Sequence, residues 1–164
     1  MTARVQVVPY DDAWPALFEA EAAQIRAALG RELRVIEHVG STSVPGLAAK
    51  PVIDIAISVE SLDDLDIDAL EALGYRYVPK FEEELPNRKY FTRGDYHVHA
   101  YEQEHEEFMD YVRFRDYLRT HPEDARAYGE LKLALAAEFI DDRAGYQAAK
   151  APYVARLVAA LRRG

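Results

Sequence analysis

The sequence predicts an α+β domain: a mixed sheet of about five strands covered by helices on one side, with further helices at the C-terminus. Two observations predict this fold. Up to residue 103, short β-branched runs alternate with helical patterns, and from Glu104 onward the apolar residues recur every three or four positions. The chain has 164 residues and a hydrophobic content of 49%, which suits one domain, residues 1–164, with a sizeable core.

The first half of the chain is predicted to begin with a strand and a helix. Residues 5–8 alternate briefly before Pro9 and predict a short strand. An amphipathic helix follows and ends at Gly30. Residues 34–39 and 52–59 are rich in Val and Ile, which predicts two further strands.

The middle of the chain is predicted to hold a second helix and three more strands. Ser61 is the expected N-cap of an acidic helix that Gly74 ends, and residues 75–78 predict the strand after it. Residues 89–92 and 96–101 flank a Gly-Asp turn, which predicts a β-hairpin.

Three amphipathic helices are predicted at the C-terminal end. Their apolar stripes are Phe108, Tyr111, Val112, Phe114 and Leu118; then Tyr128, Leu131, Leu135 and Phe139; then Tyr146, Tyr153, Leu157 and Leu161. The tyrosines of these stripes are interpreted as core residues rather than as a platform for stacking a nucleotide base.

Composition excludes several classes of protein. The chain has no cysteine, so any metal must be held by oxygen or imidazole ligands. The net charge of -9 makes generic nucleic-acid binding an unfavourable interpretation, although a small anion in a local basic pocket remains compatible with it. No apolar run is long enough to span a membrane and no secretion signal is recognisable, so a cytoplasmic location is expected. The oligomeric state is left open.

The segment from His38 to Ile55 contains the most informative residues. Gly40 allows the backbone to approach a ligand closely, and the hydroxyls of Ser41, Thr42 and Ser43 are donors suited to phosphate oxygens. Lys50 adds a positive charge nearby. The rival interpretation is an ordinary turn, because these are common turn residues.

Asp54 favours the functional interpretation. A carboxylate in the middle of an Ile- and Val-rich strand is costly to bury without a cation or a hydrogen-bond donor beside it. A metal ion or a basic partner is therefore expected at Asp54.

The same residues carry a resemblance. Gly40-Ser41, followed after about a dozen residues by Asp54-Ile55, resembles the signature of the nucleotidyltransferase superfamily. Across nearly its whole length the chain also resembles the GrpB family. The matching pieces are Tyr10-Asp11 with Trp14, the run Ile36–Ile55, His97-Val98-His99, Phe114–Arg119, and Tyr146 with Lys150.

The resemblance implies a nucleotidyltransferase-like fold, nucleotide binding and a divalent metal such as Mg²⁺ or Mn²⁺. Members of the GrpB family also occur fused to dephospho-CoA kinase, which implies a kinase of the coenzyme A pathway as a partner. The sequence departs from the superfamily signature at Ala56, where a second metal-binding carboxylate is expected. A single aspartate does not hold two Mg²⁺ ions by itself.

His97 and His99 are candidates to replace the missing ligands. They lie two positions apart on a predicted strand, so their side chains point to the same face. Beside Asp54 they would form a two-histidine, one-carboxylate metal site that suits Zn²⁺, Mn²⁺ or Fe²⁺ better than Mg²⁺. The alternatives are hydrogen bonds to a phosphate or to Asp54, and a structural role.

Basic residues complete the predicted anion site. Arg88 precedes a hairpin strand and is expected near the same cleft, its alternative being a surface charge. Arg115 lies within an apolar helix stripe and should meet a carboxylate or a ligand. Lys150 is a further candidate that would point inward; the alternative is a lysine that extends along the surface. His38 is interpreted as a hydrogen-bond donor that positions the turn.

Three functions follow as hypotheses. The first is metal-dependent transfer of a nucleotidyl or phosphoryl group from a nucleoside triphosphate, with Asp54, His97, His99 and Arg88 as catalytic residues. The second is a module that binds a nucleotide or another phosphorylated small molecule without turnover. The third is assistance to a coenzyme-A-pathway kinase.

Overall fold

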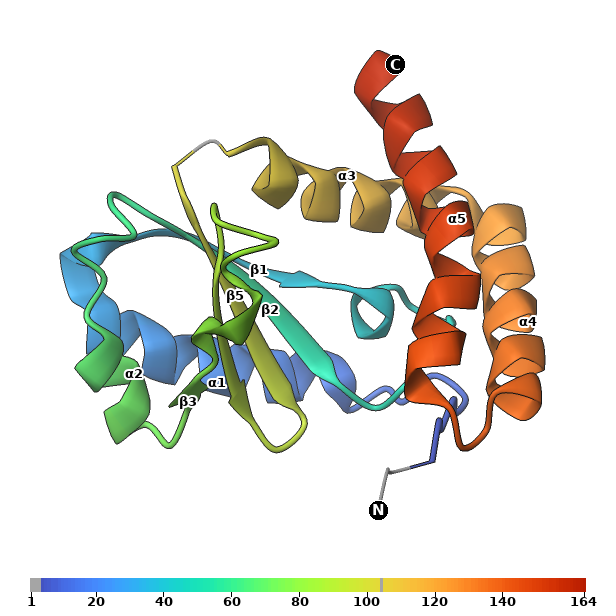
Figure 1. Cartoon of the computed structure of the whole chain (residues 1–164), viewed down its shortest axis with the longest axis horizontal. Helices are drawn as coiled ribbons and strands as arrows, with labels where there is room; N and C mark the ends of the chain where they lie inside the picture. The colour runs from blue at the N-terminus through green and yellow to red at the C-terminus, as the bar shows by residue number, and fades with distance from the viewer. Residues whose placement is uncertain (1–3, 104) are drawn as a thin grey trace.

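A five-stranded mixed sheet forms the centre of the protein (Figure 1). The computed structural model describes residues 4–103 and 105–164, so Glu104, the predicted start of the helical region, lies outside the described residues. The strand order is β1-β2-β5-β4-β3, with β2 and β5 parallel and the other neighbours antiparallel. The strands are β1 (Leu33–Val39), β2 (Ile53–Val59), β3 (Arg76–Tyr77), β4 (Lys89–Arg93) and β5 (Tyr96–Glu102). The predicted α+β class is confirmed.

Helices cover both faces of the sheet, which corrects the prediction that they lie on one side. Figure 1 shows α1 and α2 on one face, α3 on the other, and α4 packed beside α5 at one end of the sheet. No helix in the described part of the chain is long and apolar enough to cross a membrane. The helices are α1 (Trp14–Leu29), α2 (Ile67–Ala72), α3 (Glu106–Thr120), α4 (Pro122–Glu138) and α5 (Arg143–Arg163).

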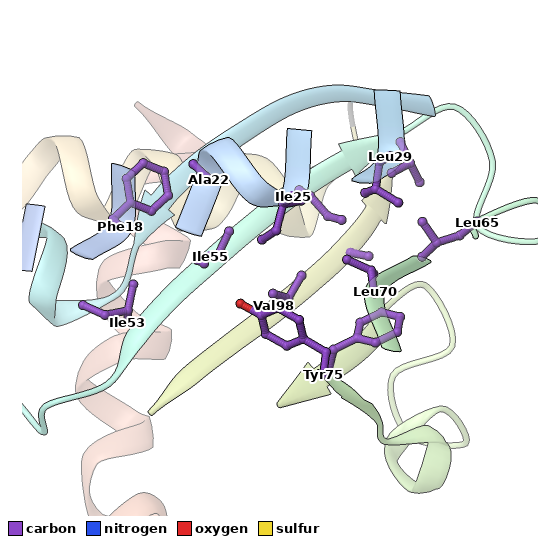
Figure 2. Close-up of a cluster of buried hydrophobic side chains, with 14 of the residues drawn as sticks. Phe18, Ala22, Ile25, Leu29, Ile53, Ile55, Leu65, Leu70, Tyr75 and Val98 are labelled. Atoms are coloured by element: carbon purple, nitrogen blue, oxygen red, sulfur yellow. The ribbon is translucent and has the colours of Figure 1, made fainter. Parts of the chain in front are cut away.

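The alternation of side chains along β2 assigns the two faces of the sheet. Ile55 and its odd-numbered neighbours pack with Ile25 of α1 in the main hydrophobic core (Figure 2). Asp54 and Ala56 point to the opposite face, where Ala56 packs in a second cluster with Phe108 of α3. Asp54 therefore lies on the face of the sheet opposite α1 and the main core.

Two of the predicted elements are wrong. Residues 5–8 form no strand of the sheet, and Val8 makes a single isolated bridge, because this segment runs beside a loop rather than along a strand. The second helix begins at Ile67 and not after Ser61. Its N-cap is Asp66, whose carboxylate accepts a hydrogen bond from a first-turn amide, as a strong N-cap does.

Candidate functional site

A pocket of about 780 Å³ opens on the face of the sheet that carries Asp54. Its floor is formed by β2, β4 and β5, and its walls by the turn after β1 and by helices α3, α4 and α5. The volume lies within the range of small-molecule binding sites. The pocket brings together most of the predicted site residues, namely Gly40, Ser41, Thr42, Lys50, Asp54, Arg88, His97 and His99.

Gly40 lets the turn after β1 lie directly against Asp54. Its φ of 73° and ψ of -176° belong to a region that glycine alone adopts readily. A Cβ atom at this position would lie 2.6 Å from Oδ2 of Asp54. The predicted close backbone approach is therefore made to the protein's own carboxylate.

Thr42 anchors the turn from inside the protein. Its hydroxyl donates a hydrogen bond to the carbonyl oxygen of Val52 at 2.9 Å, and its oxygen lies 2.9 Å from Nε2 of His38. Because the hydroxyl proton is used, Nε2 of His38 must carry the proton and donate. Burial lowers the pKa of His38 to about 4, so the ring is neutral and acts as the predicted positioning donor.

Arg115 and Ser43 lie outside the pocket. The guanidinium of Arg115 pairs with Glu37 at 2.5 Å and with Asp116 at 2.9 Å, and it donates to the carbonyl oxygen of His38. The hydroxyl of Ser43 donates to the carbonyl oxygen of Gly40. Both residues hold the turn in place, and the structure does not bring either of them to Asp54.

Asp54, His99 and Arg88 form a chain of hydrogen bonds across the pocket floor. Arginine only donates, so Nδ1 of His99, 3.2 Å from Nη1 of Arg88, accepts. The proton of His99 is therefore on Nε2, which donates to Oδ1 of Asp54 at 3.1 Å. Burial raises the pKa of Asp54, but this hydrogen bond and the nearby imidazoles and Lys150 outweigh burial and lower it overall. Asp54 is ionised and fixed in orientation.

His97 lies on the same face as His99, as predicted, but its ring is also engaged. Its Nδ1 is 2.8 Å from the hydroxyl of Tyr90 and 3.9 Å from Oδ1 of Asp54. Burial lowers the pKa of His97. In the described part of the chain, no three side chains of the metal-ligating types converge on one point. The Asp54–His97–His99 metal centre does not fit this arrangement, because these donors hydrogen-bond to one another and to Tyr90 and Arg88.

Three lysines gather at the helical wall of the pocket. Lys50 precedes β2, Lys132 lies on α4 and Lys150 on α5, and all three line the pocket. The ammonium nitrogens of Lys50 and Lys150 each lie 5.3 Å from the centre of the Tyr146 ring, and that of Lys132 lies 4.6 Å from the centre of the Tyr128 ring. These contacts hold a cluster of amino groups against the aromatic rings of α4 and α5.

The charge of the pocket is opposite to that of the chain. Its lining includes five cationic side chains, Lys50, Lys132, Lys150, Arg88 and Arg143, and three carboxylates, Asp54, Glu107 and Asp110. Asp110 is already paired with Arg162, whose Nε lies 2.9 Å away. The pocket thus has an excess of positive charge within a chain of net charge -9.

Sequence reasoning missed Lys132 and Arg143. Tyr128 and Tyr146 are buried in core clusters, as expected, and they also line the pocket, because the helices that carry them wall a cavity. Tyr111, also expected in the core, is partly buried and lines the pocket. A signal for Lys132 was present: it follows Tyr128 by four positions and so lies on the same helix face.

The fold defines a class of α+β proteins with an N-terminal helix, a five-stranded mixed sheet and three C-terminal helices. Within this class the chain belongs to the GrpB family, since the family model described as GrpB protein matches residues 4–160. The crystal structure of a conserved protein GrpB from Enterococcus faecalis is similar, with a TM-score of 0.88, 36% identity, and coverage of 96% of this chain and 98% of that chain.

Curated relatives extend the comparison. A UPF0157 protein of Pseudomonas aeruginosa is 43% identical over 94% of this chain and 66% of its own length. A dephospho-CoA kinase of Mycolicibacterium paratuberculosis is 44% identical over 78 residues, which are 44% of this chain and 19% of the kinase. The chain thus spans less than two thirds of the length of both relatives.

Proposed function

We propose that the protein binds a nucleotide or another phosphorylated small molecule in the pocket beside Asp54. The observation that carries the proposal is the excess of cationic side chains in this pocket, in a chain whose net charge is -9. Charge-assisted hydrogen bonds to phosphate oxygens contribute roughly 1.5–3 kcal/mol each, so a few of them outweigh the repulsion from the distant surface charges.

The pocket offers separate surfaces to the two parts of such a ligand. The hydroxyl-bearing turn at Ser41 and the cationic groups suit phosphate oxygens. The side chains of Tyr111, Phe114 and Val154, which also line the pocket, offer apolar surface to a base or another organic group.

A second candidate is transfer of a nucleotidyl or phosphoryl group from the bound molecule. The ionised and oriented carboxylate of Asp54, beside the turn, favours this candidate. Ala56 weighs against it, because it is buried against α3 and leaves no second carboxylate on that strand. The binding function is therefore the better supported of the two.

The similarity to part of a dephospho-CoA kinase supports a specific choice of ligands to test. Dephospho-CoA combines a nucleotide with a diphosphate, which matches the chemistry of the pocket. Assistance to a kinase of the coenzyme A pathway is the third candidate, and co-purification with such a kinase tests it.

A thermal-shift panel followed by calorimetry tests the proposal. The panel contains nucleoside triphosphates, dephospho-CoA, coenzyme A and pyrophosphate, each with and without Mg²⁺ or Mn²⁺. We expect at least one phosphorylated compound to raise the melting temperature by mass action, and the matching unphosphorylated nucleoside to leave it unchanged. A panel without any shift, confirmed by calorimetry, would contradict the proposal.

Asp54→Asn separates binding from transfer. The change removes a negative charge from the pocket but keeps the shape of the side chain, so anion affinity should rise severalfold. If the protein is a transferase, the same variant loses turnover. Lys80→Ala, which removes an exposed charge outside the pocket, is the control and should change neither property.

A further inference from the structure

Lys132 is an unusual buried side chain. It is 2% exposed, and its ammonium nitrogen has no hydrogen-bond partner among the described residues. The hydroxyl of Tyr146, in a residue 1% exposed, likewise has no partner there. Buried polar groups are almost always hydrogen-bonded, and leaving one without a partner costs about 1–3 kcal/mol. Two such groups at the wall of one pocket indicate a missing partner.

The surroundings define the charge of that partner. The charged groups that act on Lys132 are Lys50, from the segment before β2, and Lys150 of α5, and the ring of Tyr128 on α4 lies against its ammonium nitrogen. Lys50 and Lys150 in turn lie over the ring of Tyr146 on α5. Within the described chain, no carboxylate oxygen lies within 4.0 Å of any of the three ammonium nitrogens. Asp54 acts on Lys50 and Lys150 only from beyond this distance. Three amino groups without a carboxylate in contact leave an anion as the group that satisfies them.

We propose that Lys50, Lys132 and Lys150, with the hydroxyl of Tyr146, form a subsite for a phosphate group that carries two negative charges. The subsite rests on the proposed function and specifies it: the ligand is a di- or triphosphate, or a compound with a terminal phosphate, rather than a neutral or singly charged molecule. The turn at Ser41 and the lysine subsite line the same pocket, so a single ligand contacts both.

Proton uptake is an independent consequence. Burial and the charges of Lys150 and Lys50 lower the pKa of Lys132 to about 7, and burial and the charge of Lys50 lower that of Lys150 to about 8. At pH 8 Lys132 is therefore largely neutral in the free protein. A phosphate dianion favours its charged form, so binding at pH 8 should draw a proton from the buffer.

Calorimetry with pyrophosphate tests the subsite on the full chain. Wild type should bind pyrophosphate with proton uptake, seen as a difference in binding enthalpy between Tris and HEPES at pH 8. Lys132→Met and Lys150→Met should each weaken binding by about tenfold or more, and Lys132→Met should abolish most of the proton uptake. Arg126→Ala removes an exposed charge from the same helix α4 and should leave affinity unchanged.

Stability provides a readout that a structural lysine would not give. Lys132→Met replaces an unpartnered ammonium by an apolar side chain of similar length, so the ligand-free variant should melt about 2 °C or more above wild type. Unchanged pyrophosphate affinity in both lysine variants would overturn the subsite while leaving the proposed function intact. Absence of binding by wild type across the whole ligand panel would overturn both.

Discussion

Two buried polar clusters lie on opposite faces of the sheet, and they differ in whether their members are partnered. On the α1 face, the carboxylate of Glu21 accepts hydrogen bonds from Tyr75 at 2.7 Å and from Arg93 at 2.6 Å. On the pocket face, Lys132 and Tyr146 are just as buried but have no partner in the described chain. The first cluster is complete within the protein, whereas we propose that a bound phosphate completes the second.

The difference separates polar residues that stabilise the fold from those for which we propose a ligand. Arg93 also donates to the carbonyl oxygen of Leu73, so the cluster on the α1 face joins α1 and β4 to the residue that follows α2. Among the residues that the structure describes, the ammonium groups of the lysine cluster make no hydrogen bonds, and they lie near one another. Both clusters contain buried polar groups, so burial alone does not distinguish them. The presence or absence of hydrogen-bond partners does.

Removal of Arg93 should give the largest effect on stability. Arg93→Met leaves the buried carboxylate of Glu21 without its cation, which should cost about 3–5 kcal/mol of unfolding free energy. Urea denaturation measures it. Arg76→Met, at an exposed position on the neighbouring strand β3, is the control and should stay within about 0.5 kcal/mol of wild type. If Arg93→Met and Arg76→Met lost the same free energy of unfolding, the first cluster would not stabilise the fold as described.

A substitution at Gly40 tests how much the close contact between the turn and Asp54 contributes to stability on the pocket face. Gly40→Ala should lose about 3 kcal/mol, because the backbone is strained and the new Cβ meets Asp54. Gly46→Ala is a matched control: its φ of 82° is also positive, but nothing lies within 4 Å of the added Cβ. It should lose only about 1 kcal/mol. Chemical denaturation of the pair isolates the contact with Asp54, and equal losses would contradict that contact.

Two tyrosine variants, each of which removes a single hydroxyl oxygen, compare the two clusters directly. Tyr75→Phe removes a hydroxyl that donates to a buried carboxylate and should cost about 2 kcal/mol. Tyr146→Phe removes a hydroxyl that has no partner and should leave the free energy of unfolding unchanged or slightly higher. Thermal and urea unfolding of both variants without ligand measure the difference. A loss in Tyr146→Phe as large as that in Tyr75→Phe would break the comparison.

The smallest effect is a gain that depends on pH. The pKa of Lys132 is about 7 in the folded protein and 10.5 for the ordinary side chain, so between these values the unfolded state binds more protons. Stability of wild type should therefore rise with pH from 7 towards 10.5. Lys132→Met should be more stable than wild type, by about 1 kcal/mol or more at pH 7. This gain should shrink as pH rises, and a series of melting curves from pH 6.5 to 9.5 checks it. A gain that is constant across pH would refute the role of the charge.

Local patterns predicted most of the fold. Alternation and β-branching gave β1, β2 and the hairpin of β4 and β5, and the helical periods gave α3, α4 and α5. The segment at residues 5–8 was misjudged because alternation does not reveal whether a neighbouring strand is available for pairing. Helices on both faces were not foreseen, although β2 is apolar at nearly every position, a pattern typical of a strand that is buried on both faces.

The site was predicted only in part, again because local patterns do not encode how distant elements pack. Asp54 and the turn at Gly40 come from one continuous segment, and His99 joins them through the parallel pairing of β2 with β5. Lys132 and Arg143 come from distant helices, whose angle to the sheet no local pattern encodes. The hydrogen bond from Arg88 to His99, which argues against a metal at the histidine, is likewise a product of tertiary structure.

The lysine cluster also has a dynamic consequence. Its members lie on α4, on α5 and on the segment that enters β2, three parts of the chain that meet at the pocket. Repulsion among their ammonium groups works against the docking of the last two helices onto the sheet. A bound phosphate would reverse the sign of that force, so amide hydrogen exchange in α4 and α5 should slow when the pocket is filled, while exchange in α1 stays the same.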